Sequence, residues 1–319
     1  MEKNNQVPQG PSTEPPLATL SAPKSTNLFI GKNGLRAGWR LLIYMLLVIG
    51  ISSGISILIR HFVGRNTGLP SPQMLTLQEA LSFALVFGVA WVMSRIEHRG
   101  AGAYGLPFNT AFGTKFGLGF LFGLVEVSLL IGLISVFGGY SFGPLAIHGS
   151  DIVKWGLIDL VLFIFVGFFE EFLFRGYTQY TLADGIGFWP AGIIISILFG
   201  AAHLQNPGEG WVGAVSVVWI GLFFVFTLQR TGNLWYAVGL HASFDWGESF
   251  LYSVPDSGAM MQGHLSNAIL PLTPKWLTGG SVGPEGSVFC FLTIGLQFLV
   301  VMWLFPKNKD LRVEGRSYG

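Results

Sequence analysis

The segment GFFEEFLFRGYTQ, residues 167–179, places two adjacent carboxylates and an arginine in an otherwise apolar part of the chain. Ionisable side chains in such surroundings are energetically costly and are therefore usually functional. Glu171 and Arg175 are four residues apart, so on a helix they share a face and can form an ion pair, whereas Glu170 points about 100° away. We therefore take Glu170 as the free carboxylate and this segment as the chemical centre of the protein.

The composition predicts an integral membrane protein. Of the 319 residues 51% are hydrophobic and only 11% are charged, whereas soluble domains carry about 25% charged residues. The formal net charge of +1 provides no basic field that would favour a nucleic-acid partner. The single cysteine, Cys290, excludes an internal disulfide and a cysteine-rich metal site.

Apolar stretches close to the roughly 20 residues that span a bilayer alternate with short polar breaks. They predict an all-α fold, a polytopic bundle of about eight transmembrane helices with the active site in a cavity within the bundle. The expected spans are 39–59, 76–94, 116–137, 155–178, 188–204, 211–229, 234–252 and 286–305.

The remaining segments complete the expected domain organisation. Residues 1–26 are rich in Pro, Ser, Thr and Asn and predict a disordered tail. Residues 27–306 form the expected transmembrane domain, with its motif core at about 155–252, and 307–319 form a C-terminal tail. The connection 253–285 is long for a helical bundle and is therefore either functional, for example as a lid, or disordered.

The distribution of basic residues predicts the orientation. Setting aside Lys3 and Arg175, one set of span ends carries twelve of the Lys and Arg residues and the other carries four. The positive-inside rule then predicts a multi-pass protein of the cell membrane with both termini in the cytoplasm.

Further polar residues within the predicted spans include His203, His241 and Asp245. Helical spacing places Phe199 on the same face as His203. It also aligns His241, Asp245 and Glu248 in one polar stripe. Two other intramembrane carboxylates, Glu126 and Asp159, have no partner at helical spacing and fit a structural or cavity-lining role better.

A hairpin folded at residues 185–187 would bring Glu170 and His203 to the same height, because Ile186 lies midway between them. Each would stand roughly 24 Å from the turn, whereas His241 lies only about 12 Å beyond its own break. The heights match if the polar extension after Phe174 carries the turn out of the bilayer as a continued helix. Glu170, His203, His241 and Asp245 would then meet in one cavity.

Such a cluster supports hydrolysis by either of two routes. A carboxylate in an apolar pocket can act as a general base on water, and a histidine with an aspartate can stabilise the oxyanion formed at a carbonyl. Alternatively, Glu170, His203, His241 and Asp245 could bind a divalent metal such as Zn²⁺ that activates the water.

These residues resemble the CAAX protease and bacteriocin-processing family of intramembrane endopeptidases, the type II CAAX prenyl endopeptidase group. That family carries the motifs EExxxR, FxxxH and HxxxN/D on separate helices. The corresponding residues here are Glu170, Glu171 and Arg175, then Phe199 and His203, then His241 and Asp245. All three motifs occur in order, and the resemblance extends over roughly residues 90–305.

The resemblance implies that Glu170 is the general base and that His203 helps to position the attacking water, with Glu171 and Arg175 in support. It places His241 and Asp245 on the oxyanion side. Asp245 departs from the Asn that is usual in eukaryotic members, and an aspartate donates a hydrogen bond only when protonated, so a ligand or orienting role gains weight. The implied partners are a membrane-associated peptide or protein substrate and the lipid bilayer.

Two other classes of function compete with a protease. A proton-coupled transporter could use the Glu and His residues as a relay, although no inverted repeat is visible and the polar groups lie in one half of the chain. A non-catalytic scaffold or bacteriocin-immunity protein is the other alternative, against which the three intact motifs argue. Nothing in the sequence indicates an oligomeric state.

Overall fold

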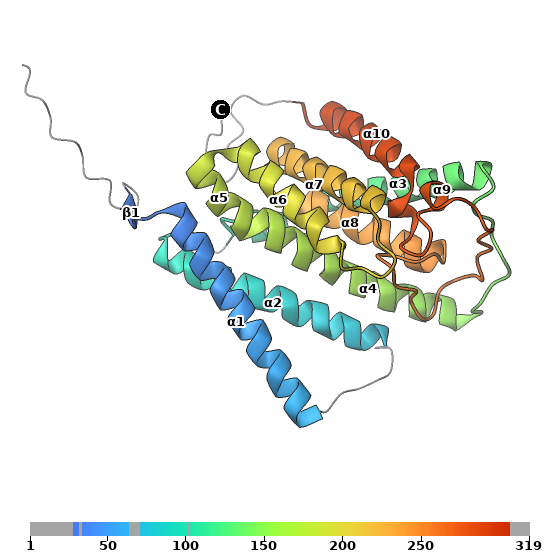
Figure 1. Cartoon of the computed structure of the whole chain (residues 1–319), viewed down its shortest axis with the longest axis horizontal. Coiled ribbons are helices and arrows are strands. Elements are labelled where there is room, and N and C mark those ends of the chain that lie inside the picture. Colours follow the sequence, from blue (N-terminus) through green and yellow to red (C-terminus); the bar gives the residue numbers. More distant parts are fainter. Residues whose placement is uncertain (1–27, 32–33, 64–70, 101, 307–319) are drawn as a thin grey trace, which may run out of the picture.

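A computed structural model describes residues 28–306 of the chain, except for 32–33, 64–70 and 101. The expected disordered tail at 1–26 and the C-terminal segment 307–319 lie outside the described residues. The two short strands, β1 (Ile30–Gly31) and β2 (Gly34–Leu35), pair as an antiparallel hairpin. The rest of the described fold is helical, as the apolar pattern predicts (Figure 1).

Each of the eight predicted spans corresponds to a helix. Those helices are α1 (Ala37–Val63), α2 (Pro72–Ile96), α3 (Thr114–Val136), α4 (Ser150–Leu173), α6 (Phe188–His203), α7 (Trp211–Thr231), α8 (Trp235–Trp246) and α10 (Val288–Leu304). Shorter elements are η1 (Phe108–Thr110), η2 (Phe174–Thr178), α5 (Gln179–Ile186), η3 (Gly247–Leu251), α9 (Lys275–Thr278) and η4 (Pro284–Gly286). The all-α polytopic membrane fold is therefore confirmed.

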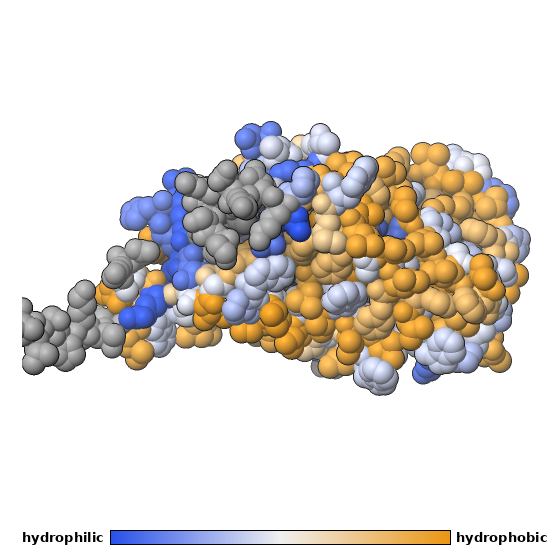
Figure 2. All heavy atoms as spheres, turned by 90° about the horizontal axis from the view of Figure 1, so that it is seen from above, coloured by the Kyte–Doolittle hydropathy of each residue, from blue (hydrophilic) through white to orange (hydrophobic). Residues whose placement is uncertain are grey.

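Five helical stretches among the described residues are long and apolar enough to cross a membrane. They are Ala37–Leu58, Pro72–Ile96, Thr114–Val136, Ser150–Ile186 and Trp211–Thr231. The apolar helices α6 and α10 are shorter, and α8 continues into η3. Figure 2 shows hydrophobic side chains over most of one face of the molecule, with hydrophilic side chains gathered toward the end next to β1.

Helix α8 lies in the centre of the bundle, between α3 and α4. Close approach to α3 depends on glycines on both helices. A Cβ at Gly119 would lie 2.1 Å from the Tyr236 carbonyl oxygen, and one at Gly239 would lie 2.3 Å from that of Phe116. Small residues are the usual means of close helix packing in membranes, where van der Waals contact drives association. This packing fixes the height of the polar residues on α8.

The helix that carries the EExxxR motif continues past Phe174 to Ile186, as the sequence predicts, but the extension is kinked. A π-helical segment, η2, follows α4, and within it Gly176 has non-helical backbone angles (ψ −121°). The glycine is needed here because a Cβ would lie 2.8 Å from the Phe172 ring. The expected turn at 185–187 is present, since α5 ends at Ile186 and Gly187 adopts a φ of +91°.

The connection between α8 and α10 packs against the bundle and is not an open loop. It forms isolated β-bridges with the α3–α4 connection, between Ser141 and Ile269 and between Leu145 and Ser266. Its later part contains α9 and η4. Asp256, Ser257 and Glu285 from this connection reach the cavities beside α8.

Candidate active site

The EExxxR motif lies at the end of α4 and the start of η2, and it forms one side of the site. Arg175 Nη1 donates to Glu171 Oε1 at 3.1 Å, and both side chains are fully buried. The guanidinium carbon of Arg175 also lies 4.1 Å from the centroid of the Phe199 ring, a cation–π contact that favours a desolvated cation. The ion pair expected from the i, i+4 spacing is therefore present, and its burial makes it part of the core.

His241 on α8 lies between the two glutamates of this motif. Its Nδ1 is 3.1 Å from Glu171 Oε1, while its Nε2 is 3.4 Å from Asp245 Oδ2 and 3.8 Å from Glu170 Oε2. The ring stacks on Phe224, with centroids 5.5 Å apart. A carboxylate acceptor at Nδ1 assigns the proton to that nitrogen. The second nitrogen, Nε2, therefore faces Glu170 and Asp245.

His203 ends α6 and is held by its own helix. Its Nδ1 lies 2.9 Å from the Phe199 carbonyl oxygen, and its ring contacts the Phe199 ring with centroids 4.5 Å apart. A carbonyl oxygen only accepts hydrogen bonds, so Nδ1 carries the proton and Nε2 keeps a lone pair. The shared face of Phe199 and His203, expected from their spacing, is observed.

The four predicted residues line one cavity of about 220 Å³, which we call the outer cavity. Glu170, His203, His241 and Asp245 contribute its polar groups, together with Glu79, Asp256 and Ser257. Its apolar wall comes mainly from α2 and α4, through Leu75, Leu162, Phe163, Val166 and Phe169. Glu170 Oε2 is buried and has no hydrogen-bond partner among the described residues. The structure thus brings the predicted residues together around a carboxylate that is free to bind a water.

A second cavity of about 70 Å³, the inner cavity, adjoins the outer one and shares His203, His241 and Asp245 with it. Its wall carries three more carboxylates, Glu248, Asp256 and Glu285, which we call the acidic triad. Burial, together with the charge of Asp256, raises the pKa of Glu285 to about 8. Burial and the charge of Asp245 likewise raise the pKa of Asp256.

The triad is also a group of three possible metal ligands that lie close to one another. One ligand atom from each of its residues lies within 4.8 Å of the others. Among the described residues, the quartet of Glu170, His203, His241 and Asp245 does not form such a group. The Nε2 atom of His241 nevertheless faces carboxylate oxygens of both Glu170 and Asp245.

Three residues of these cavities were not singled out from the sequence. Glu79 stands alone in an apolar span, and that isolation could have indicated it. Asp256 and Glu285 lie in an irregular connection, where helical spacing carries no information. The contact between Glu171 and His241 joins residues 70 positions apart and has no local signal in the sequence.

The fold and the site together define a polytopic α-helical membrane protein with a cavity lined by carboxylates and histidines. Residues 153–247 match the family model described as type II CAAX prenyl endopeptidase Rce1-like. This segment contains all three motifs, and the match supports assignment to the CAAX protease and bacteriocin-processing family. Comparisons with the curated proteins and with the solved structures found no match. The match therefore supports the interpretation of this protein as a hydrolase of the CAAX-type intramembrane protease class.

Proposed function

We propose that this protein is an intramembrane endopeptidase that hydrolyses a peptide bond of a membrane-associated protein or peptide, with Glu170 as the general base. One observation carries the proposal: the unpartnered oxygen of Glu170 lies in the same cavity as His203, His241 and Asp245. A cavity of about 220 Å³ also has room for several waters. The mainly apolar α2 and α4 wall suits a substrate that arrives from the bilayer.

In this mechanism a water lies between Glu170 and His203. The lone pair on His203 Nε2 accepts one hydrogen bond from the water and so orients it, and Glu170 removes the other proton as the oxygen attacks the scissile carbonyl. Collapse of the tetrahedral intermediate breaks the C–N bond, and Glu170 returns the proton to the leaving amine. The products are a carboxylic acid, whose proton passes to the amine on ionisation, and that amine. No co-reactant other than water is needed.

His241 is placed to stabilise the oxyanion. Its Nδ1–H donates to Glu171, so in the imidazolium form Nε2–H can donate toward the outer cavity. A preorganised donor of this kind is among the largest contributions to acyl-transfer catalysis. Asp245, at 3.4 Å from Nε2, would favour the imidazolium and orient the ring. Asp245 therefore acts through His241. This role is compatible with an aspartate at the position where eukaryotic members usually have Asn.

The alternative in which Glu170, His203, His241 and Asp245 hold Zn²⁺ is less well supported. Such an ion would supply Lewis-acid activation of water when bound. Ligands at zinc distances of about 2.0–2.2 Å need donor atoms within about 4.4 Å of one another. Those four residues do not meet even the 4.8 Å limit as a group among the described residues, so binding would require the side chains to move.

The first prediction concerns Glu170→Gln, which preserves shape but cannot accept a proton. We expect cleavage to fall at least about 100-fold, the lower range for loss of a general base, with thermal stability nearly unchanged. Membranes of cells that carry the variant should accumulate an uncut protein, identified by comparing termini with the wild type by mass spectrometry. The cleaved bond can then be tested as a synthetic peptide with purified protein.

The matched control is Glu126→Gln on α3, outside both cavities. Glu126 is another buried glutamate whose oxygens have no hydrogen-bond partner in the described part of the chain. This variant should cleave at the wild-type rate. Wild-type cleavage by Glu170→Gln would refute the proposal, and substrate-dependent proton flux in liposomes would favour a transporter instead. Inhibition by 1,10-phenanthroline, reversed by Zn²⁺, would favour the zinc mechanism.

A further inference from the structure

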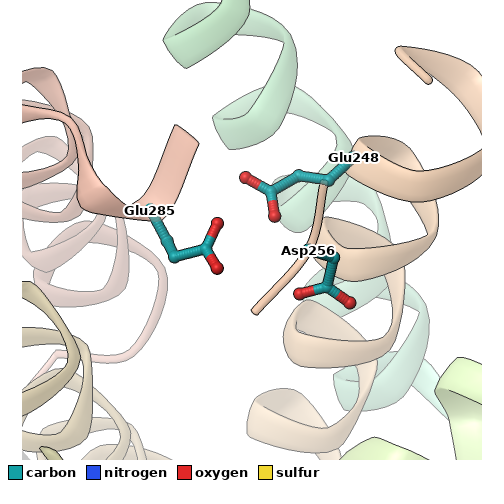
Figure 3. A group of neighbouring side chains, drawn as sticks. All are labelled: Glu248, Asp256 and Glu285. Atoms are coloured by element: carbon teal, nitrogen blue, oxygen red, sulfur yellow. The ribbon is translucent and has the colours of Figure 1, made fainter. Parts of the chain in front are cut away.

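We propose that the acidic triad binds a hard divalent cation, with Ca²⁺ as the best match, and that the bound cation fastens the connection between α8 and α10 to the bundle beside the outer cavity. The three ligands come from separate places: Glu248 from η3, Asp256 from the start of the connection and Glu285 from η4. Figure 3 shows the three carboxylates directed toward one another.

The spacing fits a shared ion. Ca²⁺ binds oxygens at about 2.3–2.6 Å, so two ligands on opposite sides of it are about 4.6–5.2 Å apart and adjacent ligands are closer. One oxygen from each triad residue lies within 4.8 Å of the other two. The inner cavity, at about 70 Å³, has room for an ion with a few water ligands.

Glu248 supplies an independent indication of a missing ligand. Its side chain is fully buried, and neither carboxylate oxygen has a hydrogen-bond partner among the described residues. No lysine or arginine in the described part of the chain forms an ion pair with the triad. A buried carboxylate without a donor or counter-charge is strongly unfavourable, and a bound cation would remove that cost.

Glu285 is held in an orientation that leaves one oxygen for a ligand. The Ser257 N–H donates to Glu285 Oε1 at 2.6 Å, whereas Oε2 is buried and has no hydrogen-bond partner among the residues that the structure describes. Next to it, a Cβ at Gly283 would lie 2.5 Å from Glu285 Oε2 and 2.3 Å from the Pro255 carbonyl oxygen. A side chain at position 283 would therefore intrude on the oxygens, and glycine keeps a backbone carbonyl close to the triad.

The ligand set selects the class of ion. All candidate ligands are oxygens, which suit Ca²⁺, Mg²⁺ and Mn²⁺, whereas structural zinc sites favour cysteine and histidine. Mg²⁺ requires a near-ideal octahedron at about 2.0–2.1 Å, but Ca²⁺ accepts irregular sets of carboxylate and carbonyl oxygens. Ligands from three separate segments form an irregular set of this kind.

The competing explanation is a cluster of carboxyl groups that share protons. In that case Glu248 and Glu285, each of which has an oxygen within 4.8 Å of the other, would share one proton. A proton-sharing cluster would respond to pH but not to Ca²⁺, so a direct binding measurement separates the two explanations.

The experiment uses the purified full-length protein in detergent, stripped with EDTA, desalted and titrated with Ca²⁺. Equilibrium dialysis with ⁴⁵Ca²⁺ should give saturable binding of one ion per chain, and the thermal unfolding temperature should rise over the same concentration range. Glu248→Gln and Glu285→Gln should each weaken Ca²⁺ binding at least tenfold. Glu126→Gln, equally buried but outside the triad, should bind as the wild type does.

The unfolding temperatures of the wild type and of Glu248→Gln, compared with and without Ca²⁺, distinguish a cation site from a cluster with a purely structural role. In EDTA, Glu248→Gln should unfold at the same temperature as the wild type or higher, because a repelling charge has been removed; in Ca²⁺ the wild type should be the more stable. The less buried Glu285→Gln provides the same test if Glu248→Gln does not fold. Absence of saturable binding up to about 10 mM Ca²⁺, beyond even weak extracellular sites, or wild-type binding by both variants, would overturn the proposal. Neither result bears on cleavage by Glu170.

Discussion

At the scale of single residues, Glu171 is the point where the site and the core meet. Its Oε1 accepts from Arg175 and lies at the same 3.1 Å from His241 Nδ1, so one carboxylate both pairs with a buried cation and orients the histidine. The i, i+4 rule correctly predicted the first contact. The second joins α4 to α8, and helical spacing within either segment contains no information about it. Glu171 is therefore a positioning residue whose role was only half visible in the sequence.

This arrangement predicts a large effect for Arg175→Met. Removing the cation leaves Glu171 buried with one of its two partners gone, and breaking a buried pair in this way costs about 3–5 kcal/mol. Thermal or SDS unfolding should show the loss, and Glu171→Gln in the same chain should restore part of it because the unpaired charge disappears. Arg95→Met, at an exposed position, is the control. A loss below about 1 kcal/mol, as for an exposed pair, would contradict the buried ion pair.

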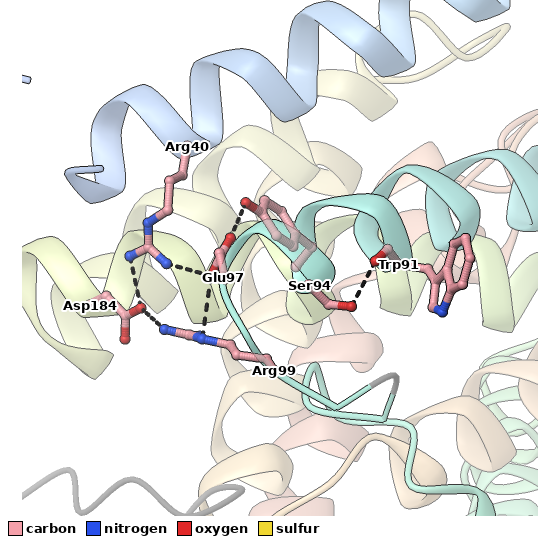
Figure 4. A network of polar contacts seen from close by, with 7 residues as sticks. Arg40, Trp91, Ser94, Glu97, Arg99 and Asp184 are labelled. Atoms are coloured by element: carbon pink, nitrogen blue, oxygen red, sulfur yellow. Dashed lines mark hydrogen bonds and ion pairs between the residues drawn. The ribbon is translucent and has the colours of Figure 1, made fainter. Parts of the chain in front are cut away.

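At the scale of elements, all eight predicted helices are present, because long apolar runs bounded by polar breaks are a strong signal. The break at Gly176 was missed, since an isolated glycine in a helical pattern is usually tolerated. The polar segment after Gly176 was expected to set the height of His203. It also makes a contact with α1 and α2 that the sequence could not indicate. Asp184 at the end of α5 binds Arg40 on α1 and Arg99 after α2, as Figure 4 shows.

Glu97 lies at the centre of this network. Its contacts predict that the network stabilises the position of α1 on the bundle. It pairs with Arg40 at 2.5 Å and with Arg99 at 3.3 Å, and it accepts a hydrogen bond from Tyr177 at 2.6 Å. Its side chain is only 5% exposed, so Glu97→Gln should cost about 1.5–3 kcal/mol, the range for hydrogen bonds to a charged group.

Hydrogen exchange of the backbone amides should show which helices lose stability in Glu97→Gln. Amides at the start of α1 should exchange faster in Glu97→Gln, whereas those of the central α8 should change little. Asp151→Asn, an exposed change in the first turn of α4, should leave both unaffected. Equal acceleration in α1 and α8 would show instead that the network stabilises the bundle as a whole.

At the scale of the whole molecule, contacts among the described helix ends gather several of the basic residues that predicted the orientation. The start of α1 contacts the end of α2 through Arg40 and Glu97, and Lys115 at the start of α3 donates to the Thr231 carbonyl at the end of α7. Arg230 donates to the Phe305 carbonyl, just after α10. The even number of predicted spans is consistent with this arrangement, because the first helix begins and the last ends on the same side.

The orientation of that end is predicted by charge to be cytoplasmic, and single cysteines can test it. Leu272 is fully exposed in the α8–α10 connection, and Asn109 is exposed in η1 at the basic end. In intact cells a membrane-impermeant maleimide should label Leu272→Cys, whereas Asn109→Cys should react only after lysis. The native Cys290 is buried and gives no background. The reverse pattern would place the basic end outside and would contradict the orientation predicted from the distribution of charge.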